Sequence, residues 1–317
     1  MKHNSKIVAS LVILFLVSQI VGLGLLAYIT EVSVAPTGEI NVVHGDTVIG
    51  PRPEVSGADS FLLVIFSVLL GTGLILLLIR LGLGNMWKGL FFFAVFMTIF
   101  VSLGVFLESL IAFAIAIILA LVKIFKPNII LHNFTEILIY SGIALIFVPI
   151  FNVEWIIALL LAISVYDFIA VFKSKHMISI AKFQTDSRVF AGLSIPYKVK
   201  MPKAKVKEIP SKTAKKMKQA GTSIVKTVRE REETVEAILG GGDIAFPLIF
   251  AGVVMSDLIV KSGLTRMDAF LKVLIIPIVV SIFLLLLFIK GKKGKYYPAM
   301  PFLTAGSLLG MLIVWLI

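Results

Sequence analysis

Two aspartates lie in apolar segments of this chain, where a pair of carboxyl groups could activate water or carry protons. Asp167 lies within the apolar run 155–172, six residues before Lys173. Asp243 begins the next apolar run, seven residues after Glu236. If these runs are consecutive membrane-crossing helices, both carboxyl groups lie at a similar depth, roughly 10 Å from one surface. An acidic side chain inside hydrocarbon costs about 3 kcal/mol, so two at one depth favour a functional site over structural hydrogen bonds.

The composition places these aspartates in a membrane protein. Of the 317 residues, 59% are hydrophobic and 15% are charged, too few polar residues to cover a water-soluble fold of this size. The chain has no cysteine, which excludes a disulfide scaffold, cysteine catalysis and thiolate metal sites. Its net charge of +12 is concentrated in a few segments, so no nucleic-acid partner is expected.

Eight apolar runs could cross a hydrocarbon core of about 30 Å as helices. The run 89–122 is too long for one span, and its single charged residue, Glu108, predicts a turn between two. Glu136 is expected at the membrane interface, just before the fifth span. The first run is longer than the core of a signal peptide and is expected to remain as a helix. The predicted spans cover residues 7–29, 61–79, 89–107, 109–125, 137–151, 155–172, 244–260, 270–289 and 300–317.

The predicted fold class is therefore an all-α polytopic membrane protein with nine transmembrane helices. Its orientation follows from lysine and arginine, which gather at the amino terminus and in every second loop and favour the cytoplasm. The opposite face carries only Arg52, Lys261, Arg266 and Lys272. This pattern predicts a cytoplasmic amino terminus and a carboxyl terminus outside.

The spans and loops predict three regions. Residues 1–172 hold the first six helices, residues 173–239 form a basic cytoplasmic loop, and residues 240–317 hold the last three helices. We expect the loop to be mobile and attracted to anionic lipid, by about 1 kcal/mol per basic residue near the surface. Within it, residues 211–236 have a helical composition. Residues 189–199 form an extended stretch that could pair with a strand of a partner.

The residues around Asp243 favour an open backbone at the site. Gly240, Gly241 and Gly242 precede it directly. Three glycines interrupt a helix and remove side-chain bulk, so that another backbone can approach the carboxyl group. Main-chain groups released at this depth are tolerated only in a water-accessible cavity.

Three short motifs occur in order along the chain. They are Tyr166-Asp167 in the sixth predicted span, Gly240-Gly241-Gly242-Asp243 at the seventh, and Pro298-Ala299-Met300 before the ninth. The ordered set resembles the presenilin and signal peptide peptidase family of intramembrane aspartyl proteases, whose motifs are YD, GxGD and PAL in the same helices. Met300 replaces the leucine of that pattern, an apolar change of similar volume that bears on substrate contacts rather than on the chemistry. The predicted orientation matches the presenilin branch, and the short soluble regions resemble an archaeal presenilin homologue.

The resemblance implies an intramembrane aspartyl endopeptidase with Asp167 and Asp243 as its catalytic pair. One carboxylate would take a proton from water while the other, protonated, hydrogen-bonds the scissile carbonyl. No metal, cofactor or obligate protein partner is implied. Substrates would be single-pass proteins of the cell membrane with their amino terminus outside. The residues implied in substrate binding are Tyr166, Gly240, Gly241, Gly242, Pro298, Ala299 and Met300.

Other functions fit the sequence less well. A zinc protease needs an H-E-x-x-H helix, and a serine protease needs a histidine beside its serine, for example beside Ser307. All four histidines, His3, His44, His132 and His176, lie outside the predicted spans. Prepilin-type peptidases share GxGD but have fewer spans and lack the final Pro-Ala segment. The rival of a different class is a proton- or cation-coupled transporter, although we find no inverted repeat in the chain.

Overall fold

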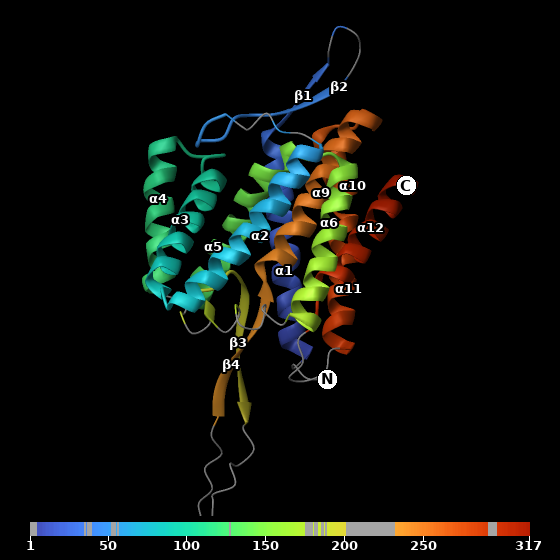
Figure 1. The fold of residues 1–317 in the computed structure, drawn as a ribbon. Helices are drawn as coiled ribbons and strands as arrows, with labels where there is room; N and C mark the ends of the chain where they lie inside the picture. The colour runs from blue at the N-terminus through green and yellow to red at the C-terminus, as the bar shows by residue number, and fades with distance from the viewer. Residues whose placement is uncertain are drawn as a thin grey trace, which may run out of the picture.

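A bundle of helices makes up most of the molecule, with one β-hairpin at each end (Figure 1). The structure is a computed structural model. It describes residues 5–34, 40–51, 57–126, 128–174, 189–200, 232–290 and 297–317, together with the isolated positions 36, 55, 180, 183, 184 and 187.

The elements follow one another along the chain as helices with two hairpin insertions. The first part comprises α1 (Ser5–Ile29), β1 (Thr30–Val34), β2 (Ile40–His44), α2 (Ala58–Leu81), α3 (Gly84–Leu103), α4 (Ser109–Phe125), α5 (Ile129–Phe147), the turn η1 (Val148–Ile150), α6 (Val153–Phe168) and the π-helical turn η2 (Ile169–Lys173). The second part comprises β3 (Gly192–Lys200), β4 (Glu232–Gly240), α9 (Gly241–Ser262), α10 (Arg266–Val273), α11 (Ile275–Lys290) and α12 (Met300–Leu316).

Several of these helices are long and apolar enough to cross a membrane. Seven such segments occur in the described part of the chain: Lys6–Ile29, Ala58–Leu81, Gly84–Leu103, Ile129–Ile150, Val153–Lys173, Gly241–Ser262 and Arg266–Ile289. The helices α4 and α12 are apolar but have 17 residues each. The multi-pass helical architecture is thus confirmed, whereas the count of nine spans requires α4 and α12 to cross as well and stays a prediction.

The boundary between α3 and α4 lies where the sequence predicts it. Glu108 is the residue before α4, so the long apolar run is divided at its one charge. The boundary of α5 was predicted wrongly. This helix begins at Ile129, and Glu136 lies inside it with 0% exposure rather than just before it. Its charge is balanced by Lys123 of α4, at 2.7 Å, a partner that the local sequence does not reveal.

The second hairpin corrects two expectations for the basic loop. β3 pairs antiparallel with β4, from Gly192 opposite Gly240 to Lys200 opposite Glu232. The extended stretch 189–199 therefore contains a strand, but its partner belongs to the same chain. Residues 232–236, expected in a helix, are part of β4, and residues 201–231 lie outside the described residues. The hairpin projects from the end of the bundle at which the amino terminus lies (Figure 1).

α9 lies at the centre of the bundle and packs against α1, α5, α6, α11 and α12. It is the most deeply buried candidate span, with 72% of its apolar window buried. α12 lies close to α11 because two glycines face it. A Cβ atom on Gly310 would lie 2.8 Å from the Cα of Ile276, and one on Gly306 would lie 3.1 Å from the Cα of Val280. Small residues let neighbouring helices approach closely. α12 also packs against α6 and α9.

Candidate active site

Asp167 lies in the last turn of α6 and is held by the segment before α12. Asp167 is buried, with 6% of the residue exposed. The main-chain amide of Met300 donates a hydrogen bond to Asp167 Oδ2 at 3.1 Å, and the amide of Ala299 is a second main-chain donor to this carboxyl group. The Pro298-Ala299-Met300 segment thus uses the unpaired amides at the start of α12 to orient Asp167.

Asp243 lies in the first turn of α9, the third residue after its N-cap, Gly240. Gly240 has an extended backbone (φ −62°, ψ 146°), and its amide donates back to the carboxyl group of Asp243. This is half of a capping box, in which a side chain at the third helical position satisfies the N-cap amide. A carboxylate here is also stabilised by the positive end of the helix dipole. The sequence therefore fixes Asp243 at the helix start.

The two aspartates meet where α6 packs against α9. Their carboxyl groups are close enough to interact electrostatically. Asp243 is partly exposed as a residue, whereas Asp167 is buried against the start of α12. Two acidic groups in this arrangement can act as an acid and a base on one reactant.

The three glycines before Asp243 differ in how tightly they are packed. A Cβ atom on Gly240 would lie 3.2 Å from Asp243 Oδ2, and one on Gly241 would lie 3.1 Å from the hydroxyl of Tyr140. On Gly242 the nearest atom would be 3.6 Å away, in Phe246, which is ordinary contact. A side chain on Gly240 or Gly241 would thus require its neighbour to shift by a few tenths of an ångström, whereas Gly242 is exposed beside the catalytic candidate.

The comparison with protein families agrees with this geometry. The family described as signal-peptide peptidase, presenilin aspartyl protease matches residues 56–317. The chain belongs to this family. As a presenilin-type aspartyl protease, it is an enzyme and an integral multi-pass membrane protein. The three motifs that suggested the resemblance all lie within the matched residues.

Two solved structures share the presenilin fold. A presenilin family intramembrane aspartate protease in space group C222 superposes with a TM-score of 0.59 at 18% identity, covering 98% of this chain and 98% of that one. The same kind of protease in space group P2 gives a TM-score of 0.57 at 19% identity, covering 97% and 96% of the two chains. No curated protein sequence matches at a significant level. At these identities, the structural likeness establishes the fold.

Tyr166, the residue before Asp167 in the presenilin-type motif, is turned toward α2. Its hydroxyl and that of Thr72 form a hydrogen bond of 2.9 Å. The sequence predicted a contact with substrate for Tyr166. The structure adds a contact between α6 and α2, and the contact with substrate stays a prediction.

Three polar side chains that support the site were not identified from the sequence. The hydroxyls of Ser164 and Thr304 lie 2.7 Å apart and join α6 to α12 near Asp167. The amide of Gln19, in α1, donates to the carbonyl of Ile244 at 2.9 Å, next to Asp243. The sequence does show each of them as a polar residue within an apolar span. This signal is weak, because many such side chains form hydrogen bonds only with the backbone of their own helix.

One argument against a serine protease needs correction. His132 lies in α5, inside a candidate span, and not outside the spans as predicted. Its ring nitrogens contact Lys123 and the carbonyl of Gly192. Ser307 is buried in α12, and its hydroxyl has no hydrogen-bond partner in the described part of the chain. Among the described residues, no three His, Asp or Glu side chains are arranged as a metal ion would require.

Proposed function

We propose that this protease hydrolyses peptide bonds within transmembrane helices of membrane-protein substrates, using Asp167 and Asp243 as a catalytic dyad. The observation that carries the proposal is that the two residues lie on helices that pack together, Asp167 in the last turn of α6 and Asp243 in the first turn of α9. Family membership supports the reaction class, and the positions of the two residues in the family motifs support their assignment.

The proposed reaction needs only water and the two carboxyl groups. Like charges this close cannot both form at low energetic cost, so the pair holds one proton. The ionised member takes a proton from water as its oxygen attacks the scissile carbonyl carbon, and the protonated member donates a hydrogen bond to the carbonyl oxygen. The tetrahedral intermediate then breaks its C–N bond while a proton passes to the leaving nitrogen. The two groups titrate as a pair, so the acid and base roles belong to the dyad.

The fixed backbone around the dyad supports this mechanism. The amide of Met300 donates a hydrogen bond to Asp167 Oδ2, and the amide of Gly240 donates one to the carboxyl group of Asp243. Preorganised groups lower the barrier because they do not need to reorient during the reaction. Gly242, Pro298 and Ala299 are proposed to contact the substrate next to the dyad.

The unwound substrate is proposed to bind as a strand beside β4. On the outer edge of β3, the main-chain groups of Gly192 and Ser194 bond side chains of α5. In an antiparallel ladder, their partners Gly240 and Ile238 direct main-chain groups away from β3. Gly240 is the N-cap of α9 and its amide binds Asp243, so the outer edge of β4 is proposed to accept an added strand at Ile238, shortly before Asp243.

Membrane topology is also part of the proposal. The amino terminus and the β3–β4 hairpin lie at the same end of the bundle (Figure 1), which agrees with placing both in the cytoplasm. Nine spans then put the carboxyl terminus outside, and substrates would be single-pass proteins of the cell membrane with their amino terminus outside. The basic loop within 173–239 would bind anionic lipid, and it divides the helices of 1–172 from those of 240–317.

The test is cleavage of a reporter helix by the purified protein in liposomes, with the fragments identified by mass spectrometry. We expect cuts inside the apolar segment of the reporter. The same liposomes are assayed for substrate uptake driven by a proton or sodium gradient. Uptake without any cleavage would reject the protease and favour a coupled transporter.

A further inference from the structure

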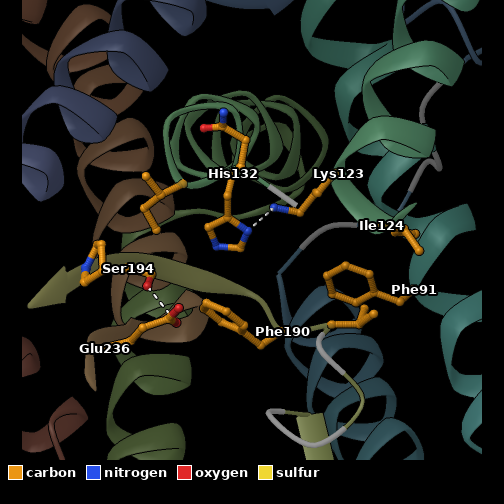
Figure 2. A pocket seen from close by; sticks show the side chains of 11 residues that line it. Phe91, Lys123, Ile124, His132, Phe190, Ser194 and Glu236 are labelled. Carbon is orange, nitrogen blue, oxygen red and sulfur yellow. Dashed lines mark hydrogen bonds between the residues drawn. The ribbon is translucent and has the colours of Figure 1, made fainter. Parts of the chain in front are cut away.

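A second group of polar side chains lies beside the candidate active site, between α4, α5 and the β3–β4 hairpin. Figure 2 shows the side chains of His132 and Lys123 joined by a hydrogen bond above Phe190, with Ser194 and Glu236 of the hairpin below them. These residues border a cavity of about 400 Å³. None of them is one of the two catalytic aspartates, so their grouping needs its own explanation.

Side chains of α5 bind the edge of β3 as a neighbouring strand would. Asn133 donates from Nδ2 to the carbonyl of Ser194 at 2.8 Å and accepts from its amide at 3.0 Å. Two residues earlier, the carbonyl of Gly192 bonds His132 Nε2 at 2.8 Å, and its amide donates to Glu136 Oε2 at 3.1 Å. Alternate residues of one strand edge thus have both main-chain groups satisfied by one helix.

Lys123 of α4 completes the network, and all three of its ammonium protons are used in hydrogen bonds. Its ammonium donates to Glu136 Oε1 at 2.7 Å, to His132 Nδ1 at 3.1 Å and to Thr135 Oγ1 at 3.2 Å. An ammonium group has three protons and can only donate. The His132 proton therefore lies on Nε2, where it binds Gly192. Because all three ammonium protons are used, the cavity beside Lys123 is a poor site for an anionic ligand.

The same network reaches the backbone that leads to Asp243. The hydroxyl of Tyr140 donates to Glu136 Oε2, one turn below it on α5. A Cβ atom on Gly241, which follows the N-cap of α9, would lie 3.1 Å from that hydroxyl. The amide of Gly241 donates to the carbonyl of Ala191, next to the clamped residue Gly192, at 3.3 Å. Glu136 thus binds Gly192 directly and reaches Gly241 through Tyr140. It is therefore linked to both segments that lie side by side just before Asp243.

We infer that Asn133 and the Lys123–Glu136 pair are positioning residues for proteolysis. They clamp β3 to α5, and through the β3–β4 ladder they hold the residues before Asp243 in the register that catalysis needs. The inference rests on the proposed function of Asp243. It assigns no proton transfer to these residues, since they act through the position of the hairpin. Displacing catalytic groups by about 1 Å can lower a rate on the order of a hundredfold.

Two variants, one single and one double, test the clamp without leaving a buried charge unpaired. Asn133→Ala removes both bonds to Ser194. Lys123→Met with Glu136→Leu removes the ion pair as a whole, whereas either single change leaves one buried charge and destabilises the fold. Asn128→Ala is the matched control, because Asn128 caps α5 by accepting from the amide of Ile130 and has no hydrogen bond to β3 in the described part of the chain.

The measurements are kcat on the reporter helix, the melting temperature in detergent, and hydrogen exchange of the segment 189–196. We expect Asn133→Ala and the double variant to lower kcat by about tenfold or more and to speed exchange at 192 and 194. The double variant should melt above both single variants without regaining their lost kcat. Asn128→Ala should keep kcat within about twofold of the wild type.

The outcomes separate this inference from the proposed function. If kcat recovers together with the melting temperature in the double variant, or if Asn133→Ala cleaves and exchanges like the wild type, the clamp has no positioning role. If the double variant does not fold, Asn133→Ala decides alone. If the wild type itself cuts no reporter, the proposed function is rejected, and exchange at 192 and 194 still tests the clamp.

Discussion

The main-chain amide of Met300 donates a hydrogen bond to Asp167 Oδ2 at 3.1 Å and joins the start of α12 to the end of α6. The two residues are 133 positions apart in the sequence. The contact uses backbone, so it depends on how α12 begins and not on the side chain of Met300. It explains how a Pro-Ala segment ahead of a helix can serve a distant aspartate.

Replacing Met300 with leucine, the residue of the family pattern, should change activity little. The amide remains, and the exchange of one buried apolar side chain for another of similar volume costs at most about 1.5 kcal/mol of stability. We expect cleavage of the reporter helix within about twofold of the wild type. Met300→Ala is the contrasting variant, since truncating this buried side chain should cost about 2–5 kcal/mol. A large loss of activity in Met300→Leu at unchanged stability would show that the side chain, not the amide, matters.

Two glycines should respond in opposite directions to alanine. Gly192 has a φ of 153°, and a Cβ atom there would collide with the carbonyl of Leu239. We expect Gly192→Ala to lose about 2 kcal/mol or more of stability. Gly242 lies in the first turn of α9 with room for a Cβ atom, so Gly242→Ala should be as stable as the wild type or slightly more stable. Melting temperatures of both variants in detergent check this, and equal losses would contradict it.

Much of this architecture could be predicted from the sequence because hydrocarbon is a demanding solvent. Charged residues are costly in hydrocarbon, so the apolar runs and the break at Glu108 indicate directly where the helices lie. The aspartates Asp167 and Asp243 were identifiable for the same reason, since an acidic residue at depth needs a functional explanation.

The remaining features depend on contacts between distant segments. Glu136 was expected at an interface, because nothing nearby in the sequence shows that Lys123 pairs with it across α4 and α5. Residues 232–236 of β4 were expected to be helical from their composition. Their extended conformation depends on pairing with β3, which is distant in the sequence. The pair of Ser164 and Thr304 likewise exists only once α6 and α12 pack together.

The bond between Tyr166 and Thr72 predicts a coupled pair. If Tyr166 acts through α2, Tyr166→Phe and Thr72→Val should each lower kcat or stability modestly, and the double variant should lose no more than the larger single loss. A double-mutant cycle on kcat and melting temperature measures this. Strictly additive losses, with a raised KM in Tyr166→Phe alone, would instead support direct contact with substrate.

The pH dependence of cleavage should be bell-shaped. At low pH both carboxyl groups are protonated and no base remains to activate water. At high pH both are ionised and no acid remains to bind the carbonyl oxygen. Rates measured on one reporter across a buffer series, with folding monitored in parallel, test this. A constant rate from about pH 4 to about pH 9 in folded protein would contradict a shared proton.

The most direct measurement compares the wild type with Asp167→Asn and Asp243→Asn on a single-pass reporter in liposomes, with products identified by mass spectrometry. Each variant keeps the size of its side chain, so melting temperatures should stay close to that of the wild type. The dyad requires cleavage by the wild type and loss of essentially all product with either variant, a fall of about ten-thousandfold or more. Wild-type cleavage rates in either folded variant would show that the two carboxyl groups do not form the catalytic pair.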